Sequence, residues 1–112
     1  MLAHLMNARV EIVRYGDGAE DDLGRPARAV LSRQADVPAR LDQLSSVEGE
    51  SFTADRWRVE LPLDTVIDAG DEVIESGRRF TVDGTPNRLT HPFLPALSRI
   101  EAHLNYVGRV DP

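Results

Sequence analysis

Short runs in which apolar and polar residues alternate, each closed by turn-forming residues, constrain the fold of this chain most strongly. The clearest run is 56–62, in which Trp57, Val59 and Leu61 alternate with charged side chains. Successive side chains of a strand point to opposite faces, so this run predicts a strand with one buried side. Pro62 closes the run because proline cannot donate a ladder hydrogen bond.

The same alternation recurs along the chain. It predicts six strands, near residues 9–15, 35–41, 56–62, 72–76, 79–84 and 99–107. Ser76-Gly77 between two of these runs predicts a β-hairpin. The last run also fits a helical face that begins at Pro95, and we favour the strand because its polar residues alternate cleanly with its apolar ones. Three stretches lack the alternation and are expected to be turns or irregular connections: residues 16–28, 42–54 and 86–95.

The chain has 112 residues, which is enough for one domain with one core. We therefore predict an all-β fold, a small antiparallel β-barrel or sandwich, formed by residues 1–112 with an N-terminal extension over residues 1–8. Residues 42–54 form a long loop between the second and third strands, and loops of this length in a compact domain are often functional. The expected core residues are Val10, Ile12, Leu41, Trp57, Val59, Leu61, Phe80, Val82, Ile100 and Leu104.

Composition excludes several functional classes. The chain contains no cysteine, which rules out a disulfide framework, a zinc ribbon and a thiol nucleophile. Its 13 basic residues are outnumbered by 19 acidic ones, for a net charge of −6, which argues against nonspecific nucleic-acid binding through a basic stripe. No apolar run approaches the length of a transmembrane helix, so we expect no membrane association.

No motif with a catalytic or metal-binding mechanism is present. Four acidic residues cluster in the first expected turn without the spacing of a calcium-binding loop: Asp17, Glu20, Asp21 and Asp22. The three histidines lie far apart and lack ligand spacing: His4, His91 and His103. Arg56 and Arg58 flank Trp57 but point away from it in a strand, which favours a core tryptophan over a base-stacking one. We expect no enzyme activity, cofactor or metal.

Three motifs follow one another between Arg56 and Pro86. They read R-W-R-V-E-L-P, then I-D-A-G-D-E-V, then G-R-R-F-T-V-D-G-T-P. They contain a strand that ends at a proline, the turn Gly70-Asp71, a hairpin glycine at Gly77, and a closing V-x-G-x-P. In this order, and in length, the chain resembles the head-completion proteins of long-tailed double-stranded DNA phages, which are head-to-tail stoppers or joining proteins.

The resemblance implies a small β-barrel that assembles in the host cytoplasm as a homo-oligomeric ring and lies in the neck of the virion. The sequence leaves the copy number open between six and twelve. The ring would lie below the portal-bound adaptor protein, close the DNA exit after packaging, and dock a tail terminator or tail tube protein. Genomic DNA would pass through its lumen without specific binding, as suits an acidic protein.

The resemblance also implies that the loop between the second and third strands gates the channel. In this chain that loop is 42–54, and its candidate gating residues are Leu44, Val47, Glu48, Gly49, Glu50 and Phe52. We expect contacts between subunits or with partners from Arg78, Arg79 and Arg88, because the guanidinium group pairs with carboxylates in a fixed geometry.

Two other functional classes stay open. A related neck or tail ring component, such as a tail terminator, would use a similar β-rich ring. An OB-type nucleic-acid-binding barrel would be retained on DNA at moderate salt, but the acidic charge and scarce aromatic residues argue against it. A small enzyme has no motif in its favour.

Overall fold

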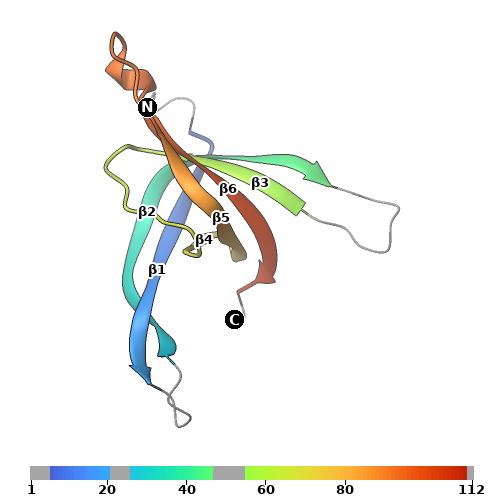
Figure 1. The fold of residues 1–112 in the computed structure, drawn as a ribbon. Helices are drawn as coiled ribbons and strands as arrows, with labels where there is room; N and C mark the ends of the chain where they lie inside the picture. The colour runs from blue at the N-terminus through green and yellow to red at the C-terminus, as the bar shows by residue number, and fades with distance from the viewer. Residues whose placement is uncertain (1–5, 21–25, 47–54, 111–112) are drawn as a thin grey trace.

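The computed structural model describes residues 6–20, 26–46 and 55–110 and places them in an all-β fold (Figure 1). Six strands form a closed barrel in the order β1-β2-β3-β6-β5-β4, and each neighbouring pair is antiparallel. The strands are β1 (Ala8–Glu20), β2 (Pro26–Ser46), β3 (Asp55–Leu61), β4 (Glu72–Glu75), β5 (Arg78–Leu89) and β6 (Arg99–Arg109). The predicted barrel is thus confirmed, and the last run is a strand.

The barrel is filled by the alternate residues that the sequence pattern singled out. Every expected core residue except Trp57 is buried, and Val13, Val37, Ala39, Ile67, Val73 and Ala102 are buried as well. Phe80 lies fully buried between Trp57 and Tyr106, with ring centroids 5.3 and 5.5 Å away. Trp57 is only partly buried and packs at the edge of this core, where the Arg78 guanidinium lies 4.8 Å from its ring centroid.

The first hairpin is longer than predicted. Residues 16–20 and 26–28, which we expected in a turn, continue β1 and β2 as a two-stranded ribbon with Asp17 opposite Arg28 and Glu20 opposite Pro26. Pairing with β4 stops at Val13, so beyond this point the ribbon has left the barrel. Because the ribbon covers no core, its sequence lacks an alternating apolar face. Its composition is therefore typical of a turn.

The other two expected connections are also shorter than predicted. Residues 42–46 belong to β2, which pairs with β3 as far as Ser46 opposite Asp55. Residues 86–89 belong to β5, which continues past a register irregularity between Asp83 and Asn87 that accommodates Pro86. In both places the described side chains lack a buried face, so the period-two signal fades for the same reason as in the ribbon.

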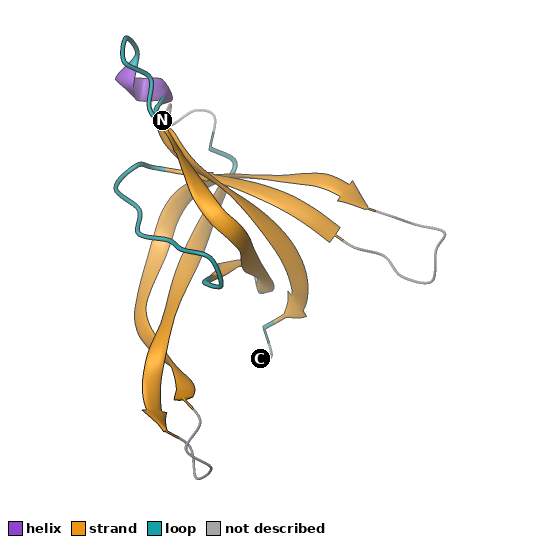
Figure 2. Ribbon diagram, in the orientation of Figure 1, coloured by secondary structure: helices purple, strands orange, loops and turns teal. Residues whose placement is uncertain are grey.

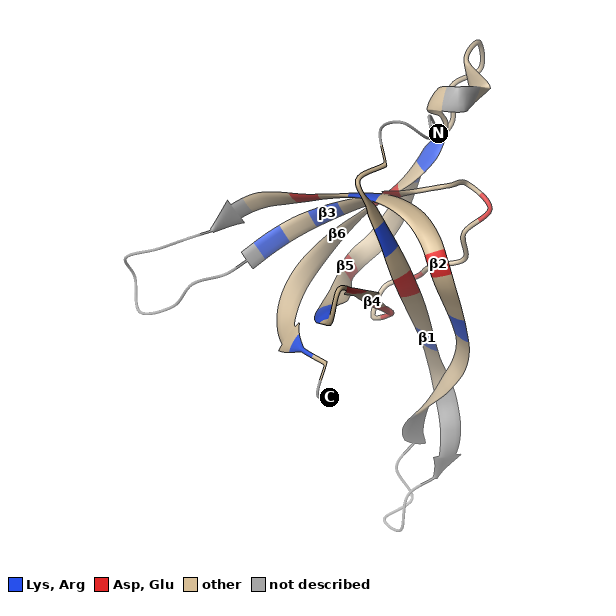
Figure 3. Cartoon of the chain, turned by 180° about the vertical axis from the view of Figure 1, so that it is seen from behind, with Lys and Arg blue, Asp and Glu red and all other residues tan. Residues whose placement is uncertain are grey.

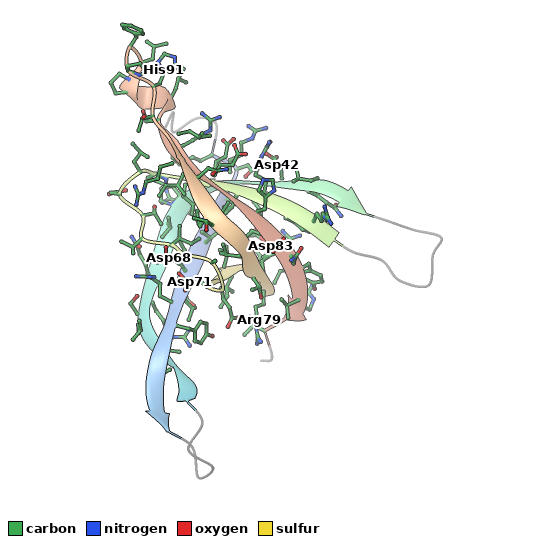
Figure 4. All side chains as sticks on the ribbon, viewed as in Figure 1. Asp42, Asp68, Asp71, Arg79, Asp83 and His91 are labelled. Carbon is green, nitrogen blue, oxygen red and sulfur yellow. The ribbon has the colours of Figure 1, made fainter. Side chains whose placement is uncertain are left out.

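The segment between β3 and β4 is fixed to the barrel by one buried carboxylate. Asp71 is 3% exposed and accepts hydrogen bonds from Asp68 N at 2.8 Å and from Arg14 Nε at 3.1 Å. Gly70, at φ 84°, lets the chain turn so that Gly70 N and the Asp71 carbonyl both bond to Val82. Asp68 and Asp71 lie together beside β1 (Figure 4), so the D-A-G-D sequence has a structural role.

Candidate assembly surfaces

Three projections extend from the barrel in different directions (Figures 1 and 2). We name them the ribbon (residues 15–20 with 26–32), the arm (43–46 with 55–56) and the finger (90–98), which joins β5 to β6 and contains the short 3₁₀ helix η2 (Pro95–Leu97). Most of the large apolar side chains that the described part exposes lie on or beside these projections: Val30, Leu31, Leu44, Leu89, Phe93 and Leu94; Val66 and Val107 lie elsewhere.

The ribbon exposes two neighbouring apolar residues. Val30 lies opposite Tyr15, and Leu31 reaches across the ribbon so that a Cβ at Gly16 would lie 2.5 Å from its Cδ1. Gly16 therefore makes room for Leu31, which is nevertheless 61% exposed. A two-stranded ribbon with exposed apolar side chains is a common element of subunit contacts because it is only marginally stable alone.

The arm holds one of the candidate gating residues. Leu44 lies on β2 and is 44% exposed, so it belongs to a strand rather than to a loop. The other candidate gating residues lie outside the described residues: Val47, Glu48, Gly49, Glu50 and Phe52. Topology agrees with the sequence interpretation in that this segment connects the second and third strands, and the gating role stays a prediction.

The three candidate contact arginines already have partners within the subunit. Arg78 pairs with Glu75 at 2.6 Å, and Arg79 pairs with Glu72 at 3.2 Å on the hairpin that joins β4 to β5. Arg88 Nη1 donates to the Leu63 carbonyl at 2.8 Å. All three remain at least partly accessible, so their contacts with other subunits stay a prediction. Arg78 and Arg79 are paired with carboxylates, whereas Arg88 bonds to a neutral carbonyl.

The finger was missed by sequence analysis, which treated 86–95 as an irregular connection. The His91 and Ser98 side chains close it: His91 N donates to Ser98 Oγ at 2.9 Å, and Leu94 N donates to His91 Nδ1 at 2.9 Å. Leu97 N and Ser98 N also bond within the finger. At its tip Phe93 is 86% exposed. The signal in the sequence was the apolar H-P-F-L-P run itself, which contains no charge to favour solvent exposure.

The outer face of β2, β3, β6 and β5 carries a row of charged residues. Asp42 lies opposite Arg58, Arg58 opposite His103, and His103 opposite Asp83. Beside this row Arg56, Asp83, His103 and Asn105 surround a hollow of about 230 Å³. His103 is exposed, as the strand pattern predicted. This face is polar and carries both positive and negative charges, which suits contact with solvent or with a polar partner surface.

A larger hollow of about 650 Å³ lies at the end of the barrel where β4 turns into β5. Met6, Ala8 and Pro38 form its apolar part, and its polar part consists of Asn7, Arg9, Glu75 and Ser76. It lies beside the start of β1, and Figure 3, which views the chain from behind, shows β1 and β2 on the near side. No described residue of the finger lines this hollow.

The described part of the chain contains no group of three or more histidine, cysteine, aspartate or glutamate side chains placed to hold a metal ion. Asp21, Asp22 and His4, considered as possible ligands from the sequence, lie outside the described residues. No helix within those residues is long and apolar enough to cross a membrane.

Comparison with known proteins supports the fold. No family model matches the chain, and no curated protein matches it. Among solved structures it is similar to the phage-like element PBSX protein xkdH from Bacillus subtilis, with a TM-score of 0.61 and 17% sequence identity. The similarity covers 88% of this chain and 92% of that chain. At this level of identity the comparison shows that the two chains share a fold over nearly their whole lengths.

Proposed function

We propose that this chain is a structural protein of a tailed-phage virion, and more specifically a head-to-tail connector stopper that forms a ring below the portal and its adaptor. The observation that carries the proposal is the shared fold with a protein of a phage-like element over 88% of the chain. The order of motifs between Arg56 and Pro86, which resembles that of head-completion proteins, supports it as a second observation.

The surface of the molecule suits an assembly subunit. A barrel that only enclosed its own core would not need three projections with exposed apolar side chains. In a ring, such projections would contact neighbouring copies, the adaptor on one side, and a tail terminator or tail tube protein on the other. A related role in another ring of the neck or tail would use the same surfaces.

Charge suits a channel through which DNA passes. With a net charge of −6 per copy, a ring of this chain would repel the DNA phosphates rather than hold them. Arg78, Arg79 and Arg88 do not form an unpaired basic stripe, because each is engaged with a carboxylate or a carbonyl of its own subunit. An OB-type nucleic-acid-binding barrel would instead need a basic groove with exposed stacking aromatic residues.

The experiment is to produce phage heads in the absence of this chain and to add it back. We expect heads packaged without it to lose DNA and to fail to join tails, and purified chain to restore both properties. Electron cryomicroscopy of complemented particles should place a ring of the chain between the portal-bound adaptor and the tail. Heads that retain DNA and join tails without the chain, or a ring at another position, would contradict the proposal.

A further inference from the structure

We propose that the finger of one copy inserts Phe93 into the hollow formed by Met6, Ala8 and Pro38 of a second copy, so that copies join head to tail. The inference rests on the ring-forming part of the proposed function and names the contact that would build the ring. It assigns a partner to the most exposed large apolar side chain of the described residues.

The first step is that hydrogen bonds and prolines constrain the finger although it is exposed. The Leu94 N to His91 Nδ1 bond and the His91 N to Ser98 Oγ bond hold its two sides together. Pro92 and Pro95 restrict its backbone further. A preformed loop that holds Phe93 at 86% exposure loses little conformational entropy on docking, which is the property of an anchor residue in an interface.

The second step is that the finger offers no charge to an anionic partner. Residues 89–98 contain no acidic or basic residue apart from His91, and the finger is free of charge colours in Figure 3. At its base Arg88 Nη1 bonds to the Leu63 carbonyl, and Arg99 Nη1 bonds to the Leu97 carbonyl. His91 itself is occupied within the finger (Figure 4). The tip therefore suits an apolar pocket rather than nucleic acid.

The third step is that the same chain provides a matching pocket that it cannot fill with its own finger. The hollow of about 650 Å³ contacts Ser76, just before β5, whereas the finger begins just after β5 ends. β5 pairs with β6 from Arg78 opposite Arg109 to Leu89 opposite Arg99, so Ser76 and the base of the finger are about 33 Å apart at the rise of a strand. Met6, Ala8 and Pro38 give the hollow an apolar wall for a phenyl ring.

The fourth step concerns symmetry. A knob and a hollow on different surfaces of one subunit form a heterologous contact, in which each copy gives one knob and accepts one. Repetition of such a contact builds a ring when the rotation between copies closes. A contact between two fingers would instead have two-fold symmetry and would stop at a dimer.

Disulfide trapping tests the contact without ambiguity, because the natural chain contains no cysteine. The variant Leu94→Cys/Ser76→Cys keeps Phe93 and places one thiol beside the knob and one at the rim of the hollow. These thiols cannot meet within one chain, since a disulfide needs Cα atoms within about 7 Å. Oxidation should therefore yield a series of linked species larger than a dimer, both in solution and in assembled particles.

Three matched variants complete the experiment. Adding Phe93→Ala to the double-cysteine chain should lower the yield of linked species by about tenfold, the effect of losing an anchor residue. Leu94→Cys/Ser32→Cys carries its second thiol on an exposed residue of the ribbon that does not line the hollow, and it should give only background linkage. Leu94→Cys alone should also remain unlinked. Unchanged thermal unfolding of each reduced variant would show that the fold is intact.

Two results would overturn the inference. Efficient dimers from Leu94→Cys alone would mean that fingers meet each other. Linkage no higher than in the Ser32 control, in solution and in particles, would mean that the finger docks on another protein. If heads without the chain leak DNA but no ladder forms, the proposed function stands and this contact is wrong. If the ladder forms and the chain is absent from the neck, the contact stands and the proposed function is wrong.

Discussion

The barrel and the finger each contain a phenylalanine, and the two side chains lie in opposite environments. Phe80 is fully buried between two aromatic rings, whereas Phe93 is 86% exposed at the tip of a loop that hydrogen bonds hold in place. Burial of a large aromatic side chain stabilises the fold, but exposure of one contributes nothing until another surface covers it. The difference in burial therefore distinguishes residues that stabilise the subunit from residues that are available for contact with another molecule.

Replacement of each phenylalanine by alanine should give the largest difference in the free energy of unfolding between the two regions. Phe80→Ala should lower the free energy of unfolding by about 3–5 kcal/mol, since it removes a buried ring and leaves a cavity. Phe93→Ala should change it by no more than about 0.5 kcal/mol, as for surface substitutions. Chemical denaturation followed by circular dichroism measures both. A large loss for Phe93→Ala would show that the finger supports the fold of its own subunit.

Trp57 lies between these two extremes. It packs edge to face against Phe80, and the guanidinium group of Arg78 lies 4.8 Å from its ring centroid and 5.7 Å from that of Phe80. Because part of the indole remains accessible, Trp57→Ala should lower the free energy of unfolding by about 3 kcal/mol, the lower end of the range for such truncations. Arg78→Ala should cost about 0.5–1 kcal/mol through loss of the cation–π contact.

The order of these two effects checks the interpretation. If Arg78→Ala destabilises the barrel as much as Trp57→Ala does, the arginine rather than the indole closes this end of the core. Denaturation curves of Trp57→Ala need circular dichroism, because Trp57 is the one tryptophan of the chain.

The pair Asp71 and Asp68 extends the comparison from apolar to charged residues. Both carboxylates pair with Arg14, but Asp71 is 3% exposed and also accepts from two backbone amides. Asp71→Ala should therefore cost about 2–3 kcal/mol, because it leaves buried donors without a partner. The Asp68 side chain is 68% exposed, so Asp68→Ala should cost no more than about 1 kcal/mol.

Salt provides a second measurement for this pair. The small contribution of Asp68 should fall further in concentrated salt, because ions screen an exposed pair more than a buried one. The contribution of Asp71 should persist, since most of it comes from backbone hydrogen bonds. Equal losses for the two variants would mean that the Gly70-Asp71 turn does not depend on the buried carboxylate.

Sequence reasoning succeeded where a strand has one buried face. Around the barrel, Val59, Leu61 and Val82 alternate with polar residues, and the alternation located all six strands and most of the core. It failed where strands leave the barrel, as in the ribbon and past Asp83 in β5, because strands without a buried face follow no apolar period.

The sequence predicted the candidate assembly surfaces less well than it predicted the fold. The role of Asp71 depends on its position beside Arg14, 57 residues away along the chain, which no local pattern reveals. The finger carries an apolar run between prolines, which predicts a loop but does not say whether that loop is buried. It is exposed because the six strands close the barrel without it. The partners of Arg78, Arg79 and Arg88 were likewise set by the β4–β5 hairpin and by the segment after β3.

The smallest expected effect on stability belongs to Leu44, and it tests the gating hypothesis through a described residue. Leu44 is 44% exposed on the arm, outside the barrel core, so Leu44→Ser should change the free energy of unfolding by no more than about 0.5 kcal/mol. If the arm closes the channel through apolar contacts between copies, heads assembled with this variant should nevertheless lose packaged DNA before tails attach.

Val66→Ser is the matched control for Leu44→Ser. Val66 is also an exposed apolar residue, but it lies between β3 and β4 rather than on a projection, so its replacement should leave DNA retention unchanged. Nuclease protection of DNA in purified heads measures retention for both variants against the wild type. Equal protection in all three would show that Leu44 is no part of a gate, while leakage from both variants would indicate a general defect of the ring. Loss of DNA from heads with Leu44→Ser alone, in a chain of unchanged stability, would show that Leu44 contributes to the assembled ring and not to the fold of the subunit.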